Sequence, residues 1–158
     1  MIKRFCAILA FLIITVVDIY AGGIPVVAYM GVPYNHSTEQ YFKEFKNAGF
    51  DICVTNYPKI SDAKKALTIA DKVGVKIIAR CVEADNNKLR MVRELMAYPA
   101  LYGYLVYDEP DSGKLGEIRQ TVKKIRQVDP KHFLYMNVLP YYGKAILKHT
   151  KTKDYDSY

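Results

Sequence analysis

Apolar residues along the chain follow two alternating spacings. Near-continuous apolar runs, rich in β-branched and aromatic residues, predict buried strands at residues 24–33, 51–58, 75–85, 101–107 and 132–140. Between these runs, apolar residues recur every three or four positions, which predicts helices at residues 37–49, 61–74, 87–98 and 112–128. A weaker pattern at 143–149 is compatible with a short helix.

Residues at the ends of the predicted helices agree with this division. Ser37, Ser61 and Ser112 stand where an N-cap is expected, since a serine hydroxyl accepts a hydrogen bond from the first turn. Gly49 and Gly74 stand where two of the helices should end. The chain therefore consists of strand–helix units without an intervening linker.

Regular strand–helix alternation, with a repeat of roughly 25–30 residues, implies right-handed βαβ units and a parallel sheet. The predicted fold class is α/β, and two architectures satisfy it. One is a complete doubly wound open sheet of five strands. The other is a partial (β/α)8 TIM barrel of about five strands, because a whole barrel needs about 250 residues and the chain has 158.

Polar and aromatic residues gather at the carboxyl ends of the predicted strands, where a barrel assembles its active site. In chain order, these ends carry Tyr34-Asn35-His36, Thr55-Asn56-Tyr57, Glu83 with Asp85, Asp108-Glu109, and Asn137 with Tyr141 and Tyr142. The opposite ends carry mostly turn formers. The first strand–helix turn, GVPYNHST, lacks the glycine-rich sequence that a phosphate or flavin site of an open sheet would need. This asymmetry favours the partial barrel.

The N-terminus has the pattern of a secretory signal peptide. Lys3 and Arg4 precede an uncharged apolar stretch at residues 5–17, and small residues follow it. The stretch is short for a membrane span, which needs about 20 apolar residues, although an uncleaved anchor is the alternative. We expect cleavage near Ala21, export to the periplasm or the extracellular space, no stable membrane insertion afterwards, and a single mature domain at residues 22–158.

The formal charge of +7 does not by itself indicate a nucleic-acid partner. The Lys and Arg residues are scattered at helical spacing, as in KKALTIADK and RQTVKKIRQ, which is typical of solvated helix faces. We therefore predict no nucleic-acid binding. Cys53 and Cys81 lie within predicted strands, either as buried thiols or as a disulfide. The histidines are isolated, so no metal or other cofactor is predicted. The alternative is a metal site with oxygen ligands, formed by Glu83, Asp85, Asp108 and Glu109.

The motif YLVYDEP on the fourth predicted strand resembles the same strand in secreted bacterial (β/α)8 glycoside hydrolases, the broad clan that includes β-galactosidases and cellulases. The segments KNAGFDICVTNY and ADKVGVKIIARC are similar to the helix–strand joints of that clan, and the resemblance covers residues 24–140. It implies hydrolysis of O-glycosyl bonds, with Glu109 as general acid/base. The clan's nucleophile, a glutamate on strand seven, has no counterpart here, so the resemblance implies an inactive N-terminal portion.

The resemblance also implies a carbohydrate substrate, for which Asp108, Asn56, Tyr57, Tyr34 and Asn137 are the candidate binding residues. Asp108 stands where the clan most often has asparagine. A glutamate at the end of an apolar strand suits the acid role, because desolvation favours its protonated form. The alternative role of Glu109 is to interact with the dipole of the following helix.

Two other functions remain open at this point. One is a non-catalytic carbohydrate-binding or scaffold protein, and the other is a complete open-sheet domain with a different ligand. The chain contains no tryptophan, the commonest sugar-stacking residue, which argues against a fully formed sugar subsite.

Overall fold

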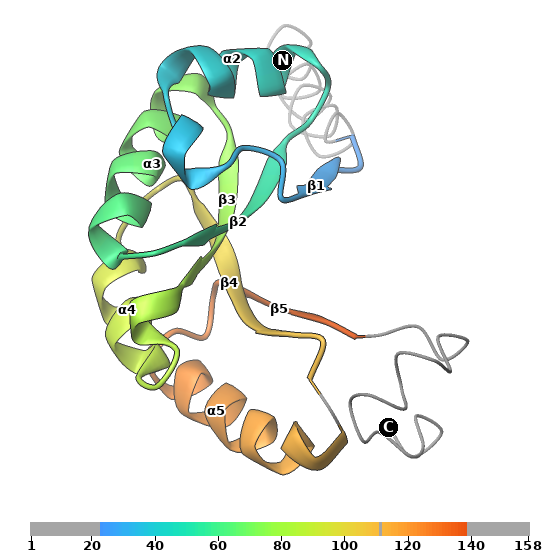
Figure 1. The fold of residues 1–158 in the computed structure, drawn as a ribbon, viewed down its shortest axis with the longest axis vertical. Helices are drawn as coiled ribbons and strands as arrows, with labels where there is room; N and C mark the ends of the chain where they lie inside the picture. The colour runs from blue at the N-terminus through green and yellow to red at the C-terminus, as the bar shows by residue number, and fades with distance from the viewer. Residues whose placement is uncertain (1–22, 111, 139–158) are drawn as a thin grey trace, which may run out of the picture.

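The computed structural model describes residues 23–110 and 112–138. Within them, strands and helices alternate as the sequence predicts (Figure 1). The strands are β1 (Val27–Tyr29), β2 (Ile52–Tyr57), β3 (Lys76–Cys81), β4 (Leu101–Asp108) and β5 (Phe133–Asn137). The helices are α2 (Glu39–Asn47), α3 (Ile60–Val73), α4 (Lys88–Leu95) and α5 (Leu115–Val128), with 3-10 turns η1 (Tyr34–His36), η2 (Val82–Ala84) and η3 (Ser112–Lys114).

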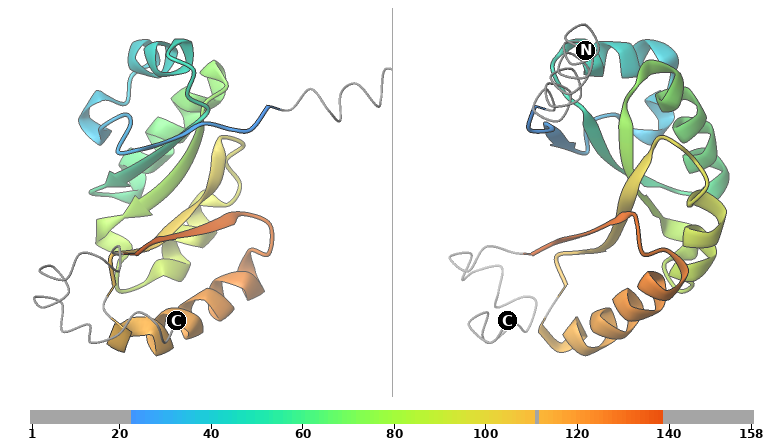
Figure 2. Two further views of the ribbon diagram at one scale, coloured as in Figure 1. Left: turned by 90° about the vertical axis from the view of Figure 1, so that its right-hand side faces the viewer. Right: turned by 180° about the vertical axis from the view of Figure 1, so that it is seen from behind.

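The five strands form one parallel sheet in the order β1-β2-β3-β4-β5. Successive strands are therefore neighbours, and the order never reverses as it does in a doubly wound sheet. Helices α2 to α5 cover one face, and the sheet curls around its other face (Figure 1 and Figure 2). The architecture is a curled half-barrel of βα units, which confirms the α/β prediction and rules out the open sheet.

The main core lies between the sheet and the helices. The predicted apolar stripes face it: Phe42 and Phe45 of α2 are buried, as are Ala66 and Leu67 of α3 and Ile125 of α5. Cys53 and Cys81 are free, buried thiols in this core, so they do not form a disulfide.

A second, smaller apolar cluster lines the concave face of the sheet. It consists of Ile52, Val54, Ile78 and Leu105, with the half-buried Tyr135 packed against them. The rings of Tyr29 and Tyr135, from the two outermost strands, approach to 6.5 Å between centroids. Strands one and five of an eight-stranded barrel lie on opposite sides of its interior, and side chains fill that interior. Contact between these rings therefore matches the curvature of such a barrel.

Several element boundaries differ from the sequence-based predictions. Thr38 rather than Ser37 caps α2, since its Oγ1 accepts a hydrogen bond from the Tyr41 backbone N–H at 3.4 Å. The helix expected to be capped by Ser61 begins at Ile60, whose N–H donates to Glu83 at 2.8 Å. Strand β3 ends at Cys81, because the chain enters a 3-10 turn there.

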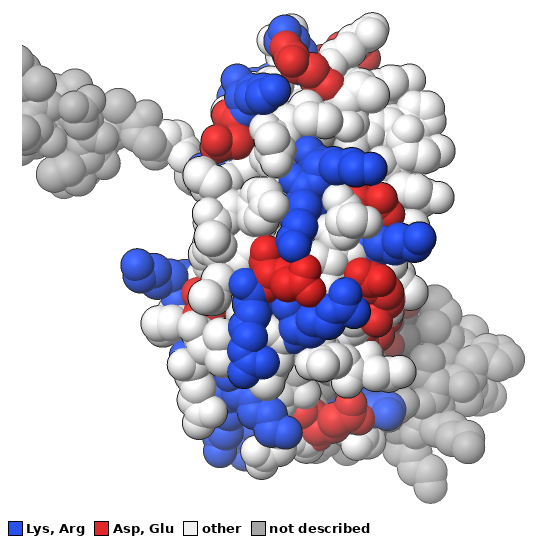
Figure 3. Space-filling model, turned by 90° about the vertical axis from the view of Figure 1, so that its left-hand side faces the viewer, with Lys and Arg blue, Asp and Glu red and all other residues white. Residues whose placement is uncertain are grey.

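The outer face formed by the helices carries charges of both signs (Figure 3). Ion pairs such as Lys64–Glu94 and Arg90–Glu94 join neighbouring helical turns and neighbouring helices. The solvated helix faces predicted from the sequence are therefore present. Among the described helices, none is both long and apolar enough to cross a membrane. The predicted signal peptide lies outside the described residues.

Candidate functional site

One side chain from each strand reaches the concave side at the carboxyl end of the sheet. These five residues, hereafter the rim cluster, are Tyr29, Asn56, Arg80, Asp108 and Asn137. Side chains two positions apart on a strand share a face. Asn56, Arg80 and Asn137 therefore lie on the same side as Val54, Ile78 and Tyr135 of the concave apolar cluster.

The pairing of strands places the two remaining members on that side. Tyr29 is the register partner of Val54, and Asp108 is the register partner of Asn137. A parallel sheet brings the ends of its strands to one edge, so residues spread over more than 100 positions of the sequence meet there. The strand-end asymmetry seen in the sequence thus corresponds to a real edge of the fold.

Asp108 is the centre of contacts within the rim cluster. The Asn137 amide donates a hydrogen bond from Nδ2 to Asp108 Oδ1 at 3.2 Å. The Tyr29 hydroxyl faces the same carboxylate, and burial together with this carboxylate raises the pKa of Tyr29 to about 12. Asp108 itself is half-buried. Strands β1, β4 and β5 thus converge on one carboxylate.

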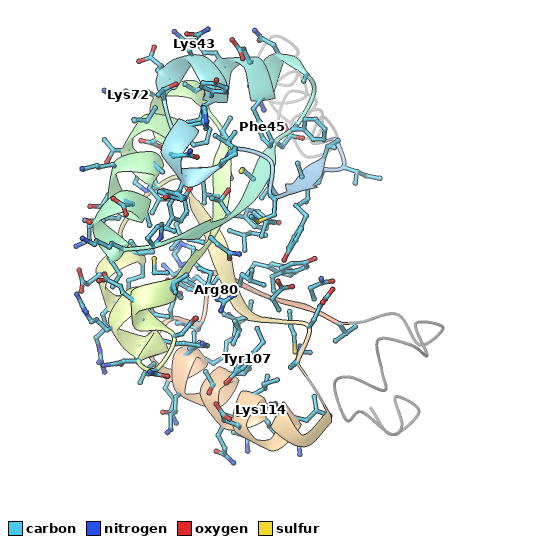
Figure 4. All side chains as sticks on the ribbon, viewed as in Figure 1. Lys43, Phe45, Lys72, Arg80, Tyr107 and Lys114 are labelled. Atoms are coloured by element: carbon cyan, nitrogen blue, oxygen red, sulfur yellow. The ribbon has the colours of Figure 1, made fainter. Side chains whose placement is uncertain are left out.

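Arg80 contributes the positive charge of the rim cluster (Figure 4). Its guanidinium makes two bonds to Asp85, from Nε to Oδ1 at 3.1 Å and from Nη2 to Oδ2 at 2.7 Å. Lys88 Nζ lies 3.4 Å from the same carboxylate. Burial acts to raise the pKa of Asp85, but Arg80 and Lys88 outweigh it and lower the pKa.

Asn56 carries an unsatisfied polar atom. Its Oδ1 is buried and has no hydrogen-bond partner among the described residues. Its Nδ2 has only a long contact of 3.9 Å to Met30 Sδ. A buried amide oxygen without a donor costs about 1–3 kcal/mol, so this position favours a water or ligand that donates a hydrogen bond.

Glu109 follows Asp108 at the mouth of the rim cluster, and its side chain is exposed. Desolvation by the apolar strand, expected from the sequence, is therefore not present in this arrangement. The Glu109 backbone N–H donates to the Asn137 carbonyl at 2.8 Å, which fixes the residue to β5.

Backbone strain occurs at two positions of this edge. Glu109 adopts φ +49° and Met30 adopts φ +55°, each directly after a strand ends. Non-glycine residues rarely adopt this left-handed conformation, which costs about 1 kcal/mol or more and tends to occur at functional sites.

Two residues predicted to bind substrate are not brought into the rim cluster. Tyr57 is fully buried in the main core, because it lies one position beyond Asn56 and faces the helices. Tyr34 is exposed on η1, after the first strand. Glu83 caps α3, as described above, so its carboxylate is engaged by the Ile60 N–H and not by a residue of the rim cluster. Tyr141 and Tyr142 lie outside the described residues.

Sequence reasoning missed Tyr29 and Arg80. Both are the last concave-facing residue of their strand, and strict two-residue alternation would have identified them. The sequence pattern predicts that the first and third strands extend to residues 33 and 85, beyond their observed ends. It therefore predicts Tyr34, Glu83 and Asp85 as the residues at these strand ends. Among the residues that the structure describes, no three acidic, histidine or cysteine side chains gather closely enough to hold a metal ion.

An apolar groove of about 360 Å³ runs along the concave face below the rim cluster. Its walls are Pro25, Val27, Tyr29, Ile52, Ile78, Tyr102, Phe133 and Tyr135. Tyr29 belongs to both the groove and the rim cluster, so the two are continuous. The arrangement combines apolar aromatic walls with a polar, hydrogen-bonding edge.

No family model matches this chain, and no curated protein matches it. The function must therefore be inferred from the fold and from the residues at the rim.

Proposed function

We propose that the chain is the N-terminal part of an exported (β/α)8 glycoside hydrolase-like protein. In the complete barrel, Glu109 serves as general acid/base in the hydrolysis of O-glycosyl bonds. The observation that carries this proposal is the rim cluster, to which every strand contributes one polar or aromatic side chain beside Glu109. Barrel enzymes assemble their catalytic residues at this edge.

The open geometry of the sheet supports the proposal that further βα units complete it. Strands β1 and β5 pair on one side only among the described residues. Exposed edges and an exposed apolar face are both unfavourable for an isolated sheet. Val27 and Phe133, for example, are about half exposed on this face, at 48% and 49%. Three additional parallel strands would pair with both edges and bury these residues.

The proposed chemistry needs a second carboxylate. Retaining hydrolysis uses two carboxyl groups about 5–5.5 Å apart, and inverting hydrolysis uses a wider spacing. Asp108 is held by Asn137 and faces Tyr29, and in this proposal it binds a sugar hydroxyl. The partner of Glu109 would come from a completing strand, as the resemblance to the glycoside hydrolase clan implies.

A second candidate function is a non-catalytic carbohydrate-binding protein. The exposure of Glu109 favours it, since an effective general acid is usually desolvated. The rim cluster and the aromatic groove would then bind a sugar without cleaving it. Both candidates share the site and differ only in the role of Glu109.

Replacement of Glu109 separates the two candidates. In the complete protein, Glu109→Gln should lower kcat/KM on phenyl glycosides by about 10²–10⁴-fold, the usual contribution of general acid–base catalysis. Glu44→Gln, which removes an exposed carboxyl on α2, is the matched control and should leave kcat/KM unchanged. Equal activity of Glu109→Gln and the unsubstituted protein would remove Glu109 from the mechanism. Absence of hydrolysis by any form, with sugar binding retained, would favour the binding protein.

A further inference from the structure

The rim cluster also indicates which sugars the site would accept, an inference that rests on the proposed carbohydrate function. Arg80 is the cation of the cluster, and an arginine fork is well suited to a carboxylate, a sulfate or a phosphate. From composition alone, Arg80 would therefore indicate an acidic ligand.

The fork of Arg80 is already occupied by the chain itself. Asp85 accepts hydrogen bonds from Nε and Nη2, at 3.1 and 2.7 Å, with parallel fork geometry. Both side chains are only about 30% exposed, at 29% for Arg80 and 30% for Asp85. Lys88 reinforces the pair with a further contact to Asp85. An acidic ligand would have to displace this carboxylate and would leave Asp85 without its main partner.

Two further charges at the concave edge are negative. Asp108 belongs to the rim cluster, and Glu109 stands next to it. Lys88 does not offset them there, because its Nζ lies 4.7 Å above the ring of Tyr107, which faces α5 through a hydrogen bond to Glu117. Because Asp85 neutralises the charge of Arg80, the rim cluster and the adjacent Glu109 together present the two carboxylates of Asp108 and Glu109 to a ligand.

The hydrogen-bonding capacity of the edge agrees with its charge. Asp108 accepts hydrogen bonds, and the buried Oδ1 of Asn56 is an acceptor without a donor. A sugar hydroxyl can donate to both groups, whereas a ligand carboxylate or sulfate can only accept. The apolar groove, continuous with this edge through Tyr29, can contact the C–H face of the same ring.

We infer that the site accepts neutral sugars and excludes acidic ones such as uronic acids and sulfated sugars. Asp85 acts as a specificity-determining residue, since it occupies the only fork in the rim cluster that could bind a ligand anion. Asp108 adds to the exclusion by like-charge repulsion and desolvation.

The test compares matched sugars by calorimetric titration of the complete protein at low ionic strength. Neutral oligosaccharides of the gluco, galacto, manno and xylo series are paired with uronic-acid oligosaccharides of the same length. We expect the tightest neutral ligand to bind at least tenfold more tightly than any acidic one. Tighter binding of an acidic member would overturn the inference and leave the proposed carbohydrate function standing. Binding of neither class would remove the proposed function instead.

A variant tests the occupied fork without reference to sugars. Asp85→Asn should free Arg80 and raise the affinity for inorganic sulfate, and for any acidic sugar, by about tenfold. Asp71→Asn, which makes the same charge change at an exposed position on α3, should not. Equal sulfate affinity of the unsubstituted protein and Asp85→Asn would overturn the role of Asp85. If Asp85→Asn does not fold, as judged by circular dichroism, the comparison of sugars on the unsubstituted protein decides alone.

Discussion

Replacement of Gly103 with alanine is expected to destabilise the protein by about 3 kcal/mol or more. Gly103 is buried in β4 and is the register partner of Phe133 in β5. A Cβ at this position would clash with the Phe133 carbonyl oxygen and would lie 2.8 Å from the carbonyl carbon. The obstacle is backbone of the neighbouring strand, so a change of side-chain rotamer cannot relieve it. The clash must separate β4 from β5.

Urea unfolding followed by circular dichroism measures this loss, and Gly116→Ala is its control. Gly116 lies in α5, and an added Cβ would meet nothing within 4 Å. Alanine is favoured over glycine in a helix by about 1 kcal/mol, so Gly116→Ala should stabilise the protein. Opposite signs for the two substitutions are expected. A Gly103→Ala variant within 1 kcal/mol of the unsubstituted protein would contradict the close pairing of β4 and β5.

Replacement of Asp129 with asparagine is expected to cost about 3 kcal/mol of unfolding free energy. Asp129 is only 4% exposed and lies between α5 and β5. Its Oδ2 accepts a hydrogen bond from the Tyr104 hydroxyl at 2.7 Å and contacts His132 Nδ1 at 2.6 Å. Its Oδ1 accepts from the backbone N–H groups of Lys131 and His132. An asparagine NH₂ would face one of these donor pairs and leave it unsatisfied.

The same carboxylate should make stability depend on acid pH. Burial acts to raise the pKa of Asp129, but hydrogen bonds from Tyr104 and His132 outweigh it and lower the pKa to about 2. Because the folded pKa lies below the ordinary value of 3.8, the contribution is complete above about pH 5. As the pH falls from about 4 to 2, this contribution is lost, and the free energy of unfolding decreases by about 2 kcal/mol.

Urea unfolding at pH 6, 4, 3 and 2 tests both statements. Asp129→Asn should be less stable at pH 6 and should lack this part of the acid loss. Asp71→Asn serves as an exposed control and should follow the unsubstituted protein. Parallel pH curves for Asp129→Asn and the unsubstituted protein would show that Asp129 is not the titrating group.

The order of the elements could be predicted from the sequence, but the closure of the sheet could not. Apolar spacing identifies each strand and helix, because burial requires one face of each to be apolar. An open sheet and a barrel share this alternation, however. They differ in whether the helices cover one face or both, which depends on packing between distant segments.

Errors at element ends had two physical sources. Ser61 was expected to cap α3, but the cap comes from Glu83, a residue more than 20 positions away. No local pattern reveals such a contact. Strand β3 was extended too far, since Val82 and Ala84 continue an apolar pattern through the turn at η2. The hydrogen bonds of Asp129 were not predicted, because the sequence Asp129-Pro130 is by itself typical of the end of a helix.

The candidate site was predicted in part. Asn56, Asp108 and Asn137 lie in the rim cluster, since strand ends of a parallel sheet share one edge. Tyr57 faces the helices instead, because a shift of one position along a strand reverses the direction of the side chain. The contacts of Arg80 with Asp85 involve side-chain geometry that a sequence does not specify.

The central claim, proton donation by Glu109 to the leaving group, is tested most directly by varying that leaving group in the complete protein. The phenolate released from a phenyl glycoside is a poor leaving group unless it is protonated. The 2,4-dinitrophenolate released from a dinitrophenyl glycoside leaves without a proton. We expect Glu109→Gln to lose about 10²–10⁴-fold in kcat/KM on the phenyl glycoside and less than about tenfold on the dinitrophenyl glycoside. Equal losses on the two substrates, or no loss on either, would contradict the assignment of Glu109 as the general acid.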